Sequence, residues 1–463
     1  MKTSAPIRLR RATLVDGSVV DVSLAAGRIA WITPAGHEPA GTPLKDLADG
    51  VPDSPADGPS GATELDLAGY LLLTAPADPH AHLDKALSWD AVRPPSGDLR
   101  TAIASWRAYA ATIDSTEIAG RATLAVTQYL ANGTTAVRTH ADVPAEGDPT
   151  RAVRALAEVR ERFSGRVHLE IAALAGPDTA DDRITAALDA GADLVGGSPH
   201  LADDQLADLH RLLDIAERRG VGVDLHIDED LRRGDTLMAF AERTLDWTVV
   251  RSAGHCVRLS TMPAPQLDVV AETVAASGIG VIANPMTNLW LQGRQEPVGT
   301  PRGIAPLDRL RAAGVLTAAG GDNVRDPFNP LGRADAFETA MLLVVAGHLP
   351  IEDAWRAVSD DARSVMGLPD AGPRVGAAAE LLAVRARSLP EAMATAPADR
   401  IVISRGRVVA RTTTTRWIDT DIDTDSGSAA GSGPGPDAGH GDGTSRSDRS
   451  RNGMSGNSKE DAA

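Results

Sequence analysis

The chain is predicted to fold as an α/β protein, a closed (β/α)8 TIM barrel with a small β-sandwich domain formed by both termini. Between residues 71 and 370, eight short apolar runs alternate with stretches of helical periodicity, as parallel strands joined by helices do. Residues 1–70 and 371–415 contain short strand-like segments separated by glycine and aspartate, which is typical of antiparallel sheets. No Gly-x-Gly-x-x-Gly follows the first barrel run, which disfavours an open doubly wound sheet.

The predicted elements follow in chain order. Strands of the β-sandwich are expected at 7–10, 19–24 and 27–32, and again at 380–384, 401–403 and 406–409. Barrel strands are expected at 71–74, 135–138, 169–174, 193–195, 221–225, 249–251, 279–283 and 315–319. Amphipathic helices such as 201–219 and 263–277 lie between them. Residues 418–463 are mostly Asp, Ser and Gly, so this acidic tail is predicted to be disordered.

Composition excludes several classes of function. The 463 residues are 43% hydrophobic, which is enough for a large core, and carry a net charge of -17, which argues against nucleic-acid binding. The single cysteine, Cys256, excludes a Cys-x-x-Cys zinc site. No apolar run approaches the roughly 20 residues of a membrane span, and no signal-peptide pattern begins the sequence. We therefore expect a cytoplasmic protein without a membrane partner, and homo-oligomerisation stays open.

Five residues suited to metal chemistry follow apolar runs. His80 and His82 come after the first run and point to the same side, which suits a divalent metal. His226, His255 and Asp322 follow the fifth, sixth and eighth runs. A single histidine is more often a packing or surface residue, but the carboxyl ends of barrel strands share one mouth. Their coincidence therefore predicts a hydrolytic metal centre there.

Glu229 lies three residues after His226. Alone it would read as a solvated loop residue between two aspartates. Beside the predicted centre, it is the best candidate for the general acid/base, because a carboxylate near an activated water can carry protons.

Longer motifs resemble the amidohydrolase superfamily, and specifically its cytosine deaminase-like branch. The similar segments are 80–84, 137–143, 226–229, 284–294 and 321–332. The resemblance implies one divalent metal, zinc or iron, held by His80, His82, His226 and Asp322. Glu229 would then shuttle protons, Asp322 would help to deprotonate the water, and His255 would orient the hydroxide without binding the metal. The family's carbamylated lysine is absent from the fourth run, which favours a mononuclear site.

Departures from the branch concern substrate recognition. Gly176 stands where a glutamine reads the pyrimidine edge, Asn323 replaces an acidic residue, and Trp290 replaces a histidine. Together with Phe328, these residues are the predicted substrate-binding positions. We therefore expect a hydrolytic deaminase of a different aminated N-heterocycle, of pyrimidine or triazine type. The alternatives are a cyclic-amide or urea-type amidohydrolase with the same metal centre, or a non-catalytic relative, which would normally lack some of these ligands.

Overall fold

The computed structural model describes residues 7–37, 63–232, 234–296 and 298–417. These residues form two sheets, one mixed and one parallel. The predicted tail at 418–463 and most of the loop at 35–62 lie outside the described residues.

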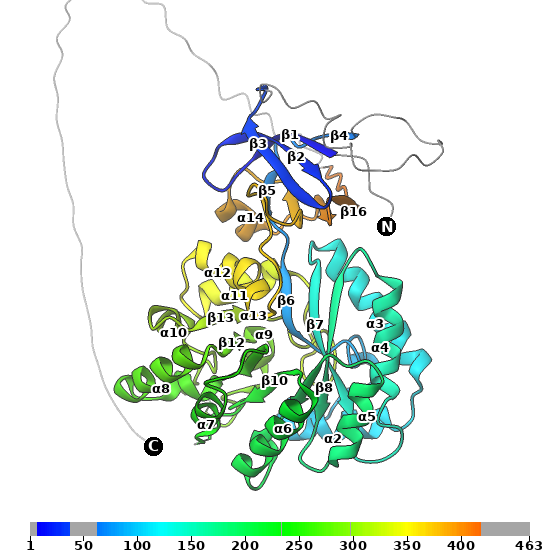
Figure 1. The fold of residues 1–463 in the computed structure, drawn as a ribbon, viewed down its shortest axis with the longest axis vertical. Coiled ribbons are helices and arrows are strands. Elements are labelled where there is room, and N and C mark those ends of the chain that lie inside the picture. The colour runs from blue at the N-terminus through cyan, green and yellow to red at the C-terminus, as the bar shows by residue number, and fades with distance from the viewer. Residues whose placement is uncertain (1–6, 38–62, 233, 297, 418–463) are drawn as a thin grey trace, which may run out of the picture. The chain divides into compact units, whose positions relative to one another are not determined.

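The mixed sheet joins the two ends of the chain, as predicted for the β-sandwich. Its strand order is β16-β15-β14-β5-β1-β2-β3, with β4 paired to β1. In Figure 1 the blue N-terminal strands lie beside the orange C-terminal ones. Apolar residues from both ends pack into a common core, among them Leu9, Val22, Leu72 and Ile401. The strands are β1 (Ile7–Thr13), β2 (Val19–Ala25), β3 (Arg28–Pro34), β4 (Thr63–Asp66), β5 (Leu71–Thr74), β14 (Leu381–Val384), β15 (Arg400–Ser404) and β16 (Arg407–Thr412).

The parallel sheet is the predicted barrel. Its eight strands pair in chain order from β6 to β13. The barrel closes because the Asp322 N–H donates to the His80 carbonyl at 2.9 Å and the His82 N–H donates to the Asp322 carbonyl at 3.2 Å. The strands are β6 (Ala77–Ala81), β7 (Ala136–Val143), β8 (His168–Ala175), β9 (Leu194–Gly197), β10 (Gly222–Ile227), β11 (Arg251–His255), β12 (Gly280–Ala283) and β13 (Leu316–Ala319).

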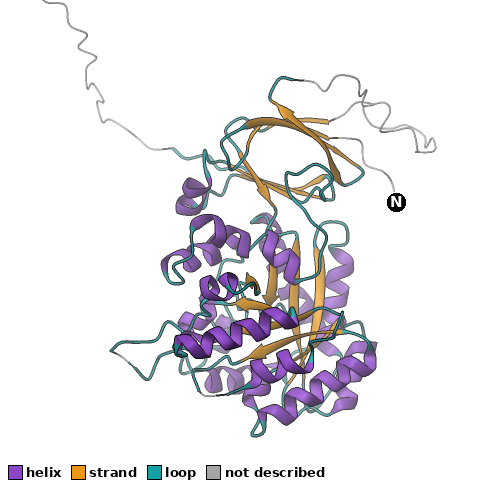
Figure 2. Ribbon diagram, turned by 60° about the vertical axis from the view of Figure 1, so that its left-hand side comes forward, coloured by secondary structure: helices purple, strands orange, loops and turns teal. Residues whose placement is uncertain are grey.

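Helices surround the barrel strands (Figure 2). Several begin at an aspartate that accepts a hydrogen bond from a free N–H of the first turn. Asp98 caps α2, Asp114 caps α3 and Asp204 caps α6. The helices are α1 (Trp89–Val92), α2 (Leu99–Ala110), α3 (Ser115–Ala131), α4 (Arg151–Arg162), α5 (Asp181–Asp189), α6 (Gln205–Arg219), α7 (Thr236–Arg243), α8 (Ala264–Ser277), α9 (Pro285–Leu291), α10 (Leu307–Ala312), α11 (Ala336–Val345), α12 (Ile351–Ala357), α13 (Asp360–Val365) and α14 (Leu389–Thr395), with 3-10 turns η1 (Pro199–Leu201) and η2 (Val257–Thr261).

One predicted barrel strand belongs to the other sheet. Residues 71–74 form β5, which pairs antiparallel with β14 and touches β1. The first barrel strand is instead β6, six residues further along, which carries His80. Leu71, Leu72 and Leu73 are all buried, and an apolar run alone does not reveal which sheet it joins. None of the helices in the described ranges combines the length and apolar character of a membrane span.

Candidate metal centre

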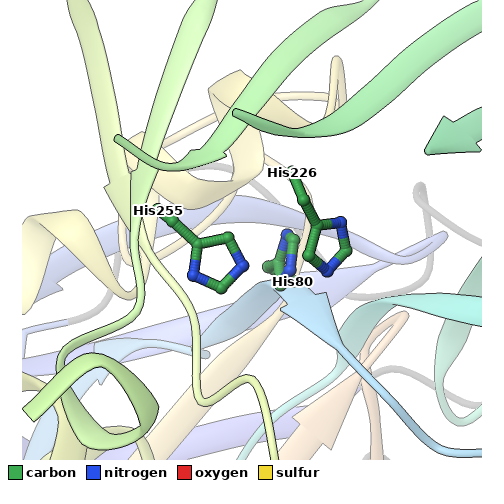
Figure 3. A group of neighbouring side chains, drawn as sticks. All are labelled: His80, His226 and His255. Carbon is green, nitrogen blue, oxygen red and sulfur yellow. The ribbon is translucent and has the colours of Figure 1, made fainter. Parts of the chain in front are cut away.

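The five residues predicted to form the metal centre meet at the carboxyl ends of the barrel strands. His80 lies in β6 with His82 just after it, His226 lies in β10, His255 ends β11, and Asp322 follows β13. All five residues are buried. Figure 3 shows the imidazoles of His80, His226 and His255 gathered around one point.

Their donor atoms are close enough to share one ion. One atom each from His80, His82 and Asp322 lies within 4.8 Å of the others, and the same holds for His80, His226 and His255. The Nε2 atoms of His82 and His226 are 3.2 Å apart, and His82 Nε2 is 3.3 Å from Asp322 Oδ1. His82 and His226, which are 144 positions apart in the chain, thus place their Nε2 atoms beside each other.

These groups fit a divalent metal by their chemistry. Burial lowers the pKa of His82 and of His226 well below the usual value, so both imidazoles are neutral and keep a lone pair for a ligand. His80 Nε2 and both carboxylate oxygens of Asp322 are buried without a hydrogen-bond partner among the described residues. Buried polar atoms nearly always have a partner, and a metal ion would satisfy all of them together.

The local backbone is held in unusual conformations to make this cluster. His255 and Asp322 have φ values of 72° and 59°, in the left-handed region that non-glycine residues seldom occupy. Such conformations cost of order 1–3 kcal/mol each and concentrate at functional sites. Gly254 is needed beside them, because a Cβ atom there would lie 2.6 Å from His80 Cε1.

Glu229 points into the same buried space. Its Oε2 lies 3.3 Å from His200 Nε2 and 4.0 Å from His255 Nε2. Burial, reinforced by the Asp322 carboxylate, raises the pKa of Glu229 well above its usual value. His200 Nδ1 lies 3.2 Å from the His226 carbonyl and donates to it, so His200 Nε2 is left as an acceptor. His200 Nε2 has no hydrogen-bond partner among the described residues, so it lies open to a proton from the nearby Glu229 carboxyl group.

The hydrogen bonds of His255 bear on which of its ring nitrogens carries the proton. Its Nδ1 faces the amide nitrogens of Asn288 at 2.9 Å and of Asn284 at 3.4 Å. An Nδ1 that accepts these bonds leaves the ring proton on Nε2. In that tautomer the Nε2–H faces Glu229 at 4.0 Å, and the role of His255 in orienting a bound group stays a prediction.

A second layer of charged residues lies beneath the ligands; Arg138 and His140 belong to the segment 137–143 noted above, whereas Asp224 was not singled out from the sequence. Asp224 Oδ1 is 3.6 Å from His80 Nδ1 and from His140 Nε2. Arg138, fully buried in β7, donates to Asp224 Oδ2 at 3.0 Å and to Glu170 at 2.8 Å. Such carboxylates orient metal-binding imidazoles. The available signal was a charged side chain, Arg138 or Asp224, at a buried position inside each of two strands.

A cavity of about 600 Å³ opens above the centre. Its floor, which we define as His82, His226, Glu229 and Asp322, belongs to the cluster described above. Its wall includes residues from α2 and from the loops after β6, β7, β8 and β13; we define the wall as Lys85, Trp106, Asp142, Gly176 and Phe328.

The predicted substrate-binding residues do not all reach this cavity. Gly176, Asn323 and Phe328 line it. The Asn323 carboxamide is already engaged, since its nitrogen donates to Asp326 at 2.7 Å and its oxygen accepts from Thr287 at 3.3 Å. Trp290 is absent from the lining, and its ring is covered by the Arg294 guanidinium at 4.2 Å. Trp290 lies in α9, two residues after Asn288, and it is the Asn288 side chain that faces His255.

Comparison with known proteins agrees with this geometry. A profile of the amidohydrolase family matches residues 117–410. The chain belongs to the amidohydrolase family. Its relatives include a pterin deaminase of Rhizobium rhizogenes (strain K84 / ATCC BAA-868), which is 33% identical over 408 residues, 84% of this chain and 88% of that protein.

Solved structures give the same result for this amidohydrolase. The 5-methylcytosine deaminase of Klebsiella pneumoniae, liganded with 5-fluorocytosine, superposes with a TM-score of 0.77 and 25% identity over 89% of this chain and 99% of that one. The N-isopropylammelide isopropylaminohydrolase of Burkholderia multivorans ATCC 17616 gives 0.72 and 27% over 88% and 99%. These matches confirm the predicted fold, the deaminase-like branch, and an enzyme that hydrolyses non-peptide C–N bonds.

Proposed function

We propose that this amidohydrolase is a metal-dependent hydrolytic deaminase of an aminated N-heterocycle, with a pterin-type bicyclic ring as the preferred substrate. The observation that carries the proposal is the floor itself, where unpaired metal-ligand atoms and a protonated carboxyl group face one cavity. A hydrolytic deamination needs these two elements, an activated water and a proton donor to the ring.

The proposed metal site holds one ion, zinc or iron, through His80, His82, His226 and Asp322. The bound ion supplies Lewis acidity, which lowers the pKa of water towards about 7. Strand β9 ends at Gly197, which is followed by Ser198. Neither residue is the bridging lysine that would bind a second ion in this family. We therefore propose a single metal.

The chain's own residues would move the protons. Glu229 donates to a ring nitrogen while a water oxygen bonds to the carbon that bears the amino group. Asp322 accepts the proton of that water, and the His255 Nε2–H donates to the attacking oxygen. Glu229, now a carboxylate, takes the hydroxyl proton of the adduct and passes it to the amino group, which leaves as ammonia when the C–N bond breaks. The ring keeps an oxo group in its place, and the proton held by Asp322 returns to Glu229.

The proposal of a pterin-type ring rests on the volume of the cavity and on the similarity to a known pterin deaminase. A cavity of about 600 Å³ lies well inside the range of sites for drug-sized ligands, and so accommodates a two-ring substrate. The relative that is 33% identical is a pterin deaminase. The second candidate is hydrolytic removal of a small amine from an aminated triazine, which is favoured by the likeness to the N-isopropylammelide enzyme. Cyclic amides are the third, because the same floor would attack them.

A substrate panel tests the proposal. The purified enzyme, with its metal content measured, would be assayed for release of ammonia or amine from pterin, N-isopropylammelide, cytosine and hydantoin. We expect ammonia release from pterin with the highest kcat/KM, and dependence of that rate on the metal. If hydantoin were the only compound hydrolysed, the reaction would be amide hydrolysis and not deamination. A metal-loaded protein that is inactive on every compound would contradict the proposal.

A further inference from the structure

Part of the cavity wall carries a charged cluster that the chemistry of the floor does not use. Lys85 lies just after the metal-binding segment, Asp142 lies near the end of β7, and Trp106 belongs to α2; all three line the cavity. The Lys85 ammonium lies 2.5 Å from Asp142 Oδ1 and 3.2 Å from both oxygens of Asp84. One cation therefore faces two carboxylates.

The two carboxylates of this cluster differ in what they face. Asp84 is 1% exposed and also accepts the Asp142 backbone N–H at 3.0 Å, so it is enclosed by protein. The side chain of Asp142 is 31% exposed. Its Oδ2 accepts from the Trp106 indole N–H at 2.6 Å. Asp142 is thus held in place from behind while its remaining lone pairs face the cavity.

The charge of this cluster is well defined. Burial lowers the Lys85 pKa, but the Asp142 and Asp84 carboxylates outweigh it, so that the pKa is raised and the amine stays protonated. Burial raises the pKa of Asp84, whereas at Asp142 burial is outweighed by the Lys85 ammonium and the pKa is lowered, so Asp142 is the carboxylate that keeps its charge. A cavity that buries such a group favours ligands with N–H donors and disfavours anionic ones.

We propose that Asp142 and Lys85 together form a substrate anchor that binds a lactam edge, a ring N–H beside a ring C=O. The Asp142 carboxylate accepts from the N–H. Lys85 has three N–H donors; one donates to Asp142 Oδ1, and one shared between the two equidistant oxygens of Asp84 leaves the third for the carbonyl oxygen. An adjacent acceptor and donor match this edge and mismatch an amidine edge, where the order is reversed.

The anchor rests on the proposed function and narrows it. It assigns specificity to amino-oxo heterocycles whose ring N–H is next to the carbon that bears the amino group, as in pterin and unlike cytosine, so that the lactam edge lies on the wall while the C–N bond to be cleaved lies over the floor. It also accounts for the lack of a carboxamide at Gly176, because the edge would be read from the other side of the cavity. A Cβ atom at Gly176 would meet Asp178 Oδ1 at 2.6 Å, so no larger side chain fits there without displacing that residue.

Two substrates and matched variants test the anchor. The substrates are 2-amino-4-oxopteridine (pterin), which has the lactam edge, and 2,4-diaminopteridine, which has an amidine edge. For Asp142→Asn and Lys85→Met we expect KM for pterin to rise about 10- to 100-fold, as for the loss of a hydrogen bond to a charged group. We expect kcat to change much less, the preference for pterin over the diamino compound to shrink, and metal content to stay at the wild-type level.

Two further variants keep the test decisive. Trp106→Phe retains the ring but removes the N–H that holds Asp142, so KM should rise by a smaller factor, about fivefold; it serves if Lys85→Met does not fold. Asp268→Asn changes an exposed carboxylate that pairs with Arg309 at the surface, and should leave both KM values unchanged. Wild-type KM and preference in folded Asp142→Asn and Trp106→Phe would reject the anchor alone. No ammonia release from pterin by the wild type would instead reject the proposed substrate class, and the anchor with it.

Discussion

The floor and the wall of the cavity differ in how their residues are positioned. Floor residues lie in or directly after barrel strands and are at most 6% exposed. Among the wall residues, Trp106 belongs to α2, Lys85, Gly176 and Phe328 lie in loops, and Asp142, near the end of β7, is partly open to the cavity. Strand ends hold a side chain within narrow limits, whereas loops tolerate substitution. The reaction therefore depends on the rigid region, and the choice of substrate on the adaptable one.

This difference has a chemical counterpart. On the floor, burial lowers the pKa of His82 and His226 and raises that of Glu229, so the exclusion of water favours the neutral form of each group. On the wall, buried charges are retained as ions because each has an opposite partner, as Lys85 has in Asp142. Substitutions on the floor should remove the activity itself, and substitutions on the wall should redirect it.

The largest effect is expected from loss of a proposed metal ligand on the floor. His226→Ala or Asp322→Ala should reduce turnover below detection and lower the bound metal, because each removes a donor atom that no neighbour replaces. Metal analysis and an ammonia assay measure both quantities. His210→Ala, at an exposed position of α6, is the matched control. Wild-type metal content in either floor variant would contradict the ligand assignment.

A smaller loss, still on the floor, is expected from Glu229→Gln. The amide keeps the shape of the side chain but moves no proton, so kcat should fall by about 10²–10⁴-fold, the usual contribution of a general acid/base. The metal should remain bound, which distinguishes this variant from the previous two. A nearly normal rate would show that Glu229 takes no part in proton transfer.

Comparing two substrates of the wild-type enzyme tests the wall without any mutation. Cytosine should have a kcat/KM about 10²–10⁴-fold below that of pterin, because Gly176 offers no carboxamide and the Asn323 carboxamide is bonded to Asp326 and Thr287. Steady-state kinetics on the two compounds measure the ratio. A cytosine kcat/KM above about 10⁵ M⁻¹s⁻¹, in the range of ordinary good enzymes, would make the protein a plain cytosine deaminase.

The smallest effect is expected where a residue belongs to neither region. Trp290 was predicted to line the pocket, yet it packs under Arg294 outside the lining. Trp290→Phe should therefore change kcat/KM for pterin by no more than about twofold, equivalent to about 0.5 kcal/mol. A larger change, seen also in the ratio of pterin to cytosine, would mean that the ring reaches the substrate after all.

Much of the floor could be predicted because the barrel imposes a regular rule. Each strand ends at the same mouth, so His80, His226 and Asp322 were expected to meet although they are far apart in the chain. His200 and Asp224 escaped this reasoning. Neither lies in a metal-binding spacing, and their importance comes only from the atoms that they face, Glu229 and His80.

The sequence by itself determined the barrel, the pairing of the two ends into one sheet and the proposed metal ligands, since apolar periodicity and residue spacing are local properties. Only the tertiary structure decided that residues 71–74 leave the barrel, that Trp290 leaves the pocket, and that Lys85, Trp106 and Asp142 meet on its wall. Those outcomes depend on which of several equally apolar or polar surfaces come into contact. Packing between segments distant in the chain settles that choice, and no single segment encodes it.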